Sequence, residues 1–432
     1  MGILETRNID FRNVIILSMN DDNFPGNISG ASSFIPYNLR AAYGMPTPEH
    51  HEGVYAYYFY RLIQRAERVD MLYCSHADDK TTGEKSRYIH QLNYESPYPI
   101  RRLNIGVDVA ATDHKTIVVE KDDSIMQRLS RYLDQQNGHY ISPSALAPYI
   151  SCPLKFYFMS IAKLRTTEEL DEEVDVPMFG TILHNAMERL YLGIKGIANP
   201  KSHLEQLLKG DTIEQAVICA INKEFLKDED YAVEDYSGSL ILIKDVVSKY
   251  IRHNVIPYDI AHCGFALMGC EEKIGCTFAL SDGREVNIGG KADRIDSLDN
   301  GNIRVVDYKT GRHPNLGFDG IDGLFHSPDR HQLNNIMQTM IYSMVLNRKY
   351  KRNVEPTLYY VQHLHKSKFS PHLVDSSKDN IEVDYLSYAE HFESELRGML
   401  DELFDPAVPF TQCKDEDAGC CEYCDFSSIC KR

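Results

Sequence analysis

The sequence predicts an α/β protein, because segments with the patterns of strands and of helices alternate along it. Residues 287–298 and 302–311 flank Asp299-Asn300-Gly301, which is a strong β-hairpin signal. Residues 178–193 and 331–346 have apolar side chains at the spacing of helices. We therefore expect a hairpin in the centre of a sheet, with helices packed beside it.

The size and composition of the chain indicate a globular protein with two or three domains. It has 432 residues, 43% of them hydrophobic and 25% charged. No apolar run approaches the roughly 18–20 residues that span a bilayer, so no membrane partner is expected. The start MGILET lacks the pattern of a signal peptide. We expect a cytoplasmic protein, in which clustered cysteines bind metal more readily than they form disulfides.

The formal net charge of -17 is unfavourable for a nucleic-acid partner, because phosphates are neutralised by lysine and arginine. The charge does not exclude such a partner, because a metal-dependent nuclease needs carboxylates at its centre.

The first domain is predicted over residues 1–105. Residues 13–20 form a mostly apolar run with valine and isoleucine, typical of a buried strand, and residues 69–74 form a second one after a long tyrosine-rich helix. Residues 106–138 are polar with weak periodicity, so we expect them to connect this domain to a second one over 139–432.

The predicted hairpin contains the candidate catalytic residues. Asp307 and Lys309 are two apart on an otherwise apolar strand, so their side chains share one face. A two-residue turn would put Asp293 opposite Tyr308, on the other face. A three-residue loop with Gly301 in the left-handed region puts Asp293 opposite Asp307, and we predict this loop.

Two converging carboxylates are suited to Mg²⁺ or Mn²⁺, which prefer oxygen ligands and retain water molecules. Lys309 beside them could orient a water molecule or offset charge that develops on a phosphate. The pattern therefore predicts metal-assisted phosphodiester hydrolysis.

GKADRID, followed by VVDYKTG, resembles the RecB-like branch of the PD-(D/E)XK nuclease superfamily. The resemblance implies a restriction-endonuclease-like core, which is a mixed sheet flanked by helices. The G-x-x-D-R-I-D and D-x-K-T-G blocks of that branch match at Gly290, Asp293, Arg294, Asp296, Asp307, Lys309 and Gly311. We expect Arg294 and Asp296 to be structural supports of the hairpin.

Two further blocks occur in the order typical of that branch. GTILH (180–184) resembles its G-x-x-x-H block, which implies that His184 is a metal ligand together with Asp293, Asp307 and the Tyr308 carbonyl. QTMIY (338–342) resembles its Q-x-x-x-Y block, which implies that Gln338 and Tyr342 contact the DNA backbone or support Lys309.

The end of the chain is rich in cysteine. Cys421, Cys424 and Cys430 have C-x2-C-x5-C spacing, which is three ligands where structural zinc would take four. Cys413 and Cys420 are local candidates for the fourth ligand.

Cys152 lies in SPSALAPYISCPLKFYF, which resembles the block that opens the nuclease domain of AddB-type proteins. The resemblance implies a [4Fe-4S] cluster held by Cys152, Cys421, Cys424 and Cys430, which would close the nuclease domain as a structural staple. Structural zinc and unliganded cysteines are the alternatives. The other cysteines, Cys413 among them, are expected to be small core residues, and Cys420 is left out of the ligand set.

The first domain resembles part of a UvrD-like superfamily 1 helicase, although the sequence has no G-x-x-x-x-G-K-[ST] phosphate loop. We therefore expect a carboxy-terminal portion of an AddB-type protein, with a degenerate helicase-like lobe over residues 1–105. The family implies a DNA exonuclease that processes double-strand ends for recombinational repair with an AddA-type helicase-nuclease partner. The alternatives are a catalytically idle DNA-binding or scaffolding subunit, a CRISPR-associated RecB-like nuclease, and a zinc-binding interaction protein.

Overall fold

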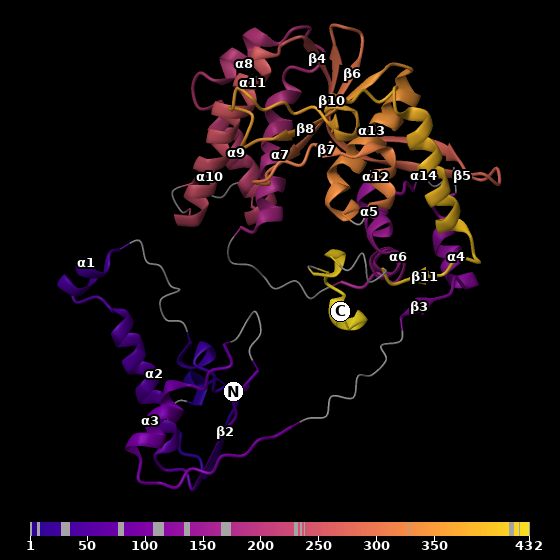
Figure 1. Cartoon of the computed structure of the whole chain (residues 1–432). Helices are drawn as coiled ribbons and strands as arrows, with labels where there is room; N and C mark the ends of the chain where they lie inside the picture. The colour runs from indigo at the N-terminus through magenta and orange to yellow at the C-terminus, as the bar shows by residue number, and fades with distance from the viewer. Residues whose placement is uncertain are drawn as a thin grey trace. The chain divides into compact units, whose positions relative to one another are not determined.

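The computed structural model divides the chain into two compact units, Met1–Ala111 and Thr112–Arg432, which are drawn in Figure 1. Among the described residues, no helix combines the length and the apolar character that a bilayer crossing requires. The structure describes residues 2–6, 9–26, 35–76, 82–106, 116–133, 139–165, 174–228, 232–233, 236, 238–327, 329–413, 419–422 and 424–431.

The first unit contains two short parallel strands, β1 (Asn13–Ile16) and β2 (Arg68–Met71), joined through the helix α2 (Pro48–Ile63). The strand β1 begins at the residue predicted for it, β2 begins one residue earlier than predicted, and both are shorter than the predicted runs. A small core lies beside them, in which the rings of Phe59 and Tyr88 are stacked with centroids 4.8 Å apart. The other elements of this unit are η1 (Leu4–Thr6), η2 (Asp22–Gly26), α1 (Tyr37–Ala42) and α3 (Arg87–Glu95).

The second unit is built on a four-stranded mixed sheet with the strand order β4-β5-β6-β8. The strands β4 (Phe265–Ala279), β5 (Glu285–Leu298) and β6 (Ile303–Lys309) are antiparallel neighbours. The strand β8 (Val354–Tyr360) runs parallel to β6, reached through the helix α13 (Asn334–Tyr350). The predicted mixed sheet flanked by helices is confirmed.

Helices cover both faces of this sheet. Successive side chains of a strand point to opposite faces, so neighbouring residues of β6 show what packs on each face. Val305 belongs to the core that contains α13, and Val306 belongs to the core that contains α7 (Val176–Leu192). The sheet is therefore the middle of three layers, α/β/α, as Figure 1 shows.

The other elements of the second unit complete these layers. The segment 106–138, expected to be a connection, contains a strand and a helix of this unit, β3 and α4. The elements are β3 (Val118–Val119), α4 (Asp123–Ser130), α5 (Pro143–Ser151), α6 (Pro153–Phe156), η4 (Tyr157–Ile161), α8 (Lys201–Leu207), α9 (Thr212–Ile221), η5 (Asn222–Leu226), α10 (Gly238–Tyr250), η7 (Ile251–Val255), α11 (Ile256–Ala261), β7 (Gly317–Phe318), α12 (Gly320–His326), η8 (Arg330–Leu333), β9 (Val374–Asp375), η9 (Ser376–Lys378), β10 (Ile381–Glu382), α14 (Ala389–Phe404), β11 (Phe410–Thr411) and α15 (Ser427–Cys430).

The β5–β6 hairpin has the predicted three-residue loop. The backbone N–H of Leu298 donates to the Asn302 carbonyl, which leaves residues 299–301 as the loop, and Gly301 has a φ of +89°. The ladder pairs Arg294 with Val306. Extending this register by one residue puts Asp293 opposite Asp307, as predicted.

Candidate functional site

Two buried carboxylates, Asp293 on β5 and Asp307 on β6, lie on neighbouring strands. Asp293 Oδ2 accepts a hydrogen bond of 2.9 Å from the backbone N–H of Tyr308. Asp307 Oδ2 lies 2.7 Å from Lys309 Nζ. Burial raises the pKa of Asp307 to about 6; Lys309 opposes this shift and the charge of Asp293 adds to it. The site therefore concentrates negative charge in a place that water screens poorly.

His184 reaches this site from α7, on the other side of the sheet from α13. Its Nε2 lies 3.1 Å from the carbonyl oxygen of Tyr308, and its Nδ1 lies 3.4 Å from Asp293 Oδ2. Burial disfavours the charged ring, but hydrogen bonds to Asp293 and Glu271 raise the pKa of His184 to about 10. The structure thus brings His184, Asp293 and the Tyr308 carbonyl together, and their role as metal ligands stays a prediction.

Glu271 belongs to the same site and was missed from the sequence. Its Oε1 lies 3.3 Å from His184 Nδ1, and its Oε2 forms an ion pair of 2.7 Å with Lys291 Nζ. Glu271 lies in β4 with a φ of +49°, a backbone conformation that is uncommon for residues other than glycine. The Asp282-Gly283 turn could have indicated it, because the β4–β5 register that this turn sets puts Glu271 opposite Asp293.

The α13 residues Gln338 and Tyr342 lie beside the lysine and the hairpin. Lys309 Nζ donates a long hydrogen bond of 3.5 Å to Gln338 Oε1. Burial raises the pKa of Tyr342 to about 12, and a hydrogen bond with Gln338 opposes this shift. A Cβ atom at Gly290 would lie 2.9 Å from the Tyr342 hydroxyl, so only glycine lets β5 approach α13 this closely.

Arg294 and Asp296 support the hairpin from inside the α7-side core, as expected. The Arg294 guanidinium is fully buried and donates to Asp259 at 2.6 Å and to Asp296 at 2.9 Å. Asp296 also accepts a bond of 2.7 Å from Arg304. These opposite charges pair with one another, although Arg294 Nη2 has no hydrogen-bond partner among the described residues, and we assign them to the scaffold of the site.

The donors of this site fit a divalent cation that prefers oxygen and nitrogen ligands. Ligand atoms of His184, Glu271 and Asp293 all lie within 4.8 Å of one another. An octahedral ion with ligands at about 2.1 Å separates adjacent ligands by about 3.0 Å, and His184 Nε2 lies 3.1 Å from the Tyr308 carbonyl oxygen. Within the described part of the chain, Asp307 Oδ2 accepts no hydrogen bond of normal geometry, so a lone pair remains available to a cation.

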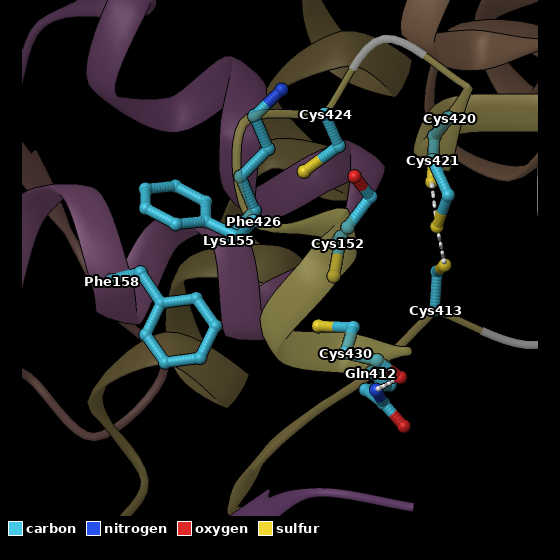
Figure 2. A pocket seen from close by; sticks show the side chains of 11 residues that line it. Cys152, Lys155, Phe158, Gln412, Cys413, Cys420, Cys421, Cys424, Phe426 and Cys430 are labelled. Carbon is cyan, nitrogen blue, oxygen red and sulfur yellow. Dashed lines mark hydrogen bonds between the residues drawn. The ribbon is translucent and has the colours of Figure 1, made fainter. Parts of the chain in front are cut away.

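A second candidate site is a pocket lined by thiols, which Figure 2 shows. The four predicted ligands all line it, although Cys152 is far from the other three in the sequence. The cysteines of this pocket are Cys152, Cys413, Cys420, Cys421, Cys424 and Cys430. A set of thiols is suited to iron-sulfur clusters and zinc, so the residues fit either group.

Cys413 is a buried core residue, as expected, but its thiol and that of Cys420 also line the pocket. Cys413 Sγ lies 3.3 Å from Cys421 Sγ, and Cys420 Sγ lies 3.9 Å from it. Cys413 follows β11, whose Thr411 carbonyl lies 4.0 Å from Cys152 Sγ. The strand β11 therefore positions Cys413 at the pocket. The spacing between Cys413 and Cys421 in the sequence matches no common ligand motif.

A comparison with protein families matches residues 140–431 to the PD-(D/E)XK nuclease superfamily. The matched range covers more than half of the chain and contains the carboxylate site and all six cysteines of the pocket.

Three similar relatives are each named as a subunit of an ATP-dependent helicase/deoxyribonuclease. The protein of Clostridium tetani is 26% identical over 193 residues, which cover 40% of this chain and 15% of the relative. The protein of Carboxydothermus hydrogenoformans is 27% identical over 180 residues, covering 40% and 16%. The protein of Clostridioides difficile is 20% identical over 375 residues, covering 71% and 31%. The chain thus spans less than a third of the length of these relatives.

Proposed function

The chain belongs to the PD-(D/E)XK nuclease superfamily, and we propose that its second unit hydrolyses phosphodiester bonds of DNA with the help of a divalent metal ion. The observation that carries this proposal is the meeting of His184, Asp293 and the Tyr308 carbonyl beside the buried pair of Asp307 and Lys309. Buried charges of this kind are costly unless they are paired or bind a metal ion.

The proposed ligands of Mg²⁺ or Mn²⁺ are His184 Nε2, the carboxylates of Asp293 and Asp307, and the Tyr308 carbonyl oxygen. When bound, the ion would offset charge on the scissile phosphate and lower the pKa of a water molecule. Asp293 also accepts from the Tyr308 N–H, so the carboxylate and the carbonyl are held in a fixed relation.

Lys309 is the proposed catalytic cation. Its ammonium is fixed by the 2.7 Å contact with Asp307, from where it can orient the attacking water and stabilise charge on the phosphate. Gln338 accepts from the same ammonium, and Tyr342 is hydrogen-bonded to Gln338. We assign to Gln338 and Tyr342 the support of Lys309 and contact with the DNA backbone.

Glu271 is proposed as a positioning residue for His184. It accepts from the Nδ1 side of the ring, which leaves the opposite nitrogen, Nε2, directed to the Tyr308 carbonyl and the cation site. Carboxylates that accept from a metal-bound histidine fix its tautomer and orientation.

We propose that Cys152, Cys421, Cys424 and Cys430 hold a [4Fe-4S] cluster in the thiol pocket. The cluster would act as a cross-link, since the proposed hydrolysis requires no electron transfer. It would join the chain near the start of the second unit to its end.

The names of the relatives support a place for this chain in a helicase-nuclease assembly. We propose that it acts as an exonuclease at DNA double-strand ends during recombinational repair, in the cytoplasm, together with an AddA-type partner.

The test is Mg²⁺-dependent digestion of linear single- and double-stranded DNA by the purified chain, compared with Asp307→Asn and Lys309→Ala. Each variant is expected to lose at least about 100-fold in cleavage rate, because each loses charge stabilisation in a buried site. Asp282→Asn, in the exposed β4–β5 turn, is the control and should cleave normally. Undiminished cleavage by either site variant would overturn the assignment.

A further inference from the structure

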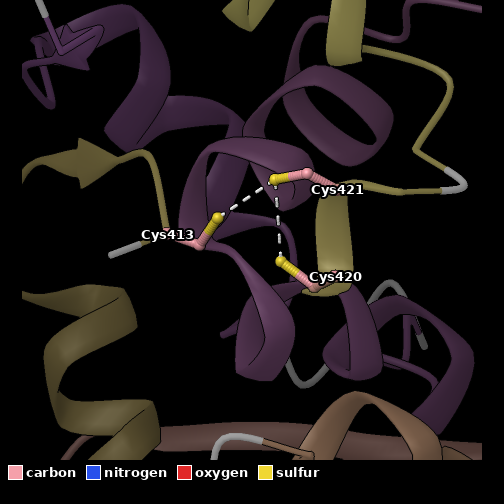
Figure 3. Close-up of side chains that lie close together, drawn as sticks. All are labelled: Cys413, Cys420 and Cys421. Atoms are coloured by element: carbon pink, nitrogen blue, oxygen red, sulfur yellow. Dashed lines mark hydrogen bonds between the residues drawn. The ribbon is translucent and has the colours of Figure 1, made fainter. Parts of the chain in front are cut away.

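We propose that Cys413 and Cys420 belong to a second ligand set in the thiol pocket, which binds a single zinc ion and shares Cys421 and Cys152 with the proposed cluster. Figure 3 shows that the thiols of Cys413, Cys420 and Cys421 converge. Their sulfur atoms all lie within 4.8 Å of one another. Cys424 and Cys430 would then serve the cluster alone.

The sulfur separations are those of ligands around one ion. A tetrahedral zinc ion with Zn–S bonds of about 2.3 Å places neighbouring sulfurs about 3.8 Å apart. Cys421 Sγ lies 3.9 Å from Cys420 Sγ and 3.3 Å from Cys413 Sγ, so these separations are close to those of ligands of one zinc ion. The thiolates of a four-iron cluster each bind a different iron, so they lie further apart.

The number of thiols in the pocket also supports a second ligand set. The pocket is lined by six cysteines, and one cluster uses four. The two thiols beyond the proposed cluster ligands are both next to the same cluster ligand, Cys421. Because Cys421 would belong to both sets, zinc and the cluster should exclude each other.

Cys152 is the fourth zinc ligand in this proposal. It lines the same pocket, where Figure 2 shows its sulfur directed inward. Its Sγ lies 4.0 Å from the carbonyl of Thr411, two residues before Cys413, so the side chain already faces the strand that delivers Cys413. Each thiol that binds zinc releases its proton to solvent, and no oxidant or reductant is needed.

The test is zinc binding by the full chain, prepared free of metal under anaerobic conditions and titrated with Zn²⁺ against a chromophoric chelator. Cys413→Ser and Cys420→Ser should each weaken zinc binding at least tenfold. Cys424→Ser, Cys430→Ser and the exposed-site control Cys219→Ser should leave it unchanged. Zinc-edge absorption of the wild-type complex should show four sulfur ligands.

Reconstitution with iron and sulfide separates this proposal from the proposed cluster. Cys413→Ser and Cys420→Ser should incorporate iron as the wild type does, which also shows that they are folded, whereas zinc-loaded wild type should incorporate none. Wild-type zinc affinity in Cys413→Ser and Cys420→Ser would overturn the second ligand set. So would an equal loss of zinc affinity in Cys430→Ser. Failure of the wild type to take up iron would instead refute the cluster while the zinc result stands.

Discussion

At the scale of single residues, the candidate nuclease site depends on charges held away from water. Asp307 is 1% exposed and its pKa is raised by burial to about 6, so its ionised form is costly without a nearby cation. Lys309 supplies part of the compensation at 2.7 Å. A divalent ion between the carboxylates would supply the rest.

This arrangement predicts how cation affinity depends on pH. Below the pKa of Asp307, about 6, binding must displace a proton from Asp307 and another from His184, whose pKa is raised to about 10. Above pH 6 only the His184 proton remains to be displaced. The logarithm of Mn²⁺ affinity, measured by calorimetry, should therefore rise with pH with a slope of about two below pH 6 and about one above it. Asp307→Asn should bind more weakly and show no change of slope; a uniform slope in the wild type would contradict this.

The raised pKa of Asp307 also determines how the free energy of unfolding of the metal-free chain changes with pH. Because the folded-state pKa of Asp307 lies above the ordinary value of 3.8, the folded chain binds more protons than the unfolded chain between those pH values. The contribution of Asp307 to the free energy of unfolding therefore falls as pH rises through this window.

The positioning role of Glu271 gives a second prediction. Glu271→Gln keeps the shape of the side chain but removes the charge that orients His184 Nδ1, so Mn²⁺ affinity should fall about 10- to 100-fold. The neighbouring Glu272→Gln is the matched control, because Glu272 pairs with Lys195 and Lys349 instead. Equal affinities of the two variants would show that Glu271 has no role at the site.

Glu271 also shows why a site is only partly predictable from sequence. His184, Asp293, Asp307 and Lys309 lie in recognisable blocks, whereas Glu271 lies in the middle of β4, outside all of these blocks. Glu271 itself has a positive φ, and no periodic pattern in the sequence signals this backbone conformation.

At the scale of elements, the β5–β6 hairpin aligns the carboxylates through its loop. A three-residue loop with Gly301 at φ +89° was readable from Asp299-Asn300-Gly301, and it determines the register. The lengths of the strands were less predictable, since β1 ends at Ile16 within an apolar run that continues to residue 20.

The buried ion network ties this hairpin to α11 and predicts a large effect on stability. Asp259→Asn should lower the free energy of unfolding by about 3–5 kcal/mol, because the fully buried Arg294 guanidinium loses a charged partner at 2.6 Å. Urea unfolding at neutral pH measures this change. Asp282→Asn, which removes the exposed ion pair with Arg284, should unfold nearly as the wild type does. A small effect of Asp259→Asn would mean that the network is not a support of the hairpin.

At the scale of the whole molecule, the thiol pocket joins distant parts of the second unit. Cys152 follows α5, and the other five cysteines lie after β11, so a bound cluster would close a loop of roughly 270 residues. The pairing of Cys152 with the terminal cysteines came from resemblance to a known block. The position of Cys413 and Cys420 at the pocket could be learned only from the structure.

This cross-link predicts a stability change that is separate from cleavage. Cys430→Ser, or anaerobic removal of iron, should lower the melting temperature of the second unit by several degrees, because the unfolded chain is no longer restricted by the closed loop. Differential scanning calorimetry measures the shift, with Cys219→Ser as the control. An unchanged melting temperature after loss of iron would exclude the role of a staple.

The most direct test of the central claim is the position of Mn²⁺ in crystals of the wild-type chain, located by its anomalous scattering. The account predicts a peak bound by His184 Nε2, the carboxylates of Asp293 and Asp307, and the Tyr308 carbonyl, with Lys309 Nζ beside it. A peak bound elsewhere, or an empty site at saturating Mn²⁺, would contradict it.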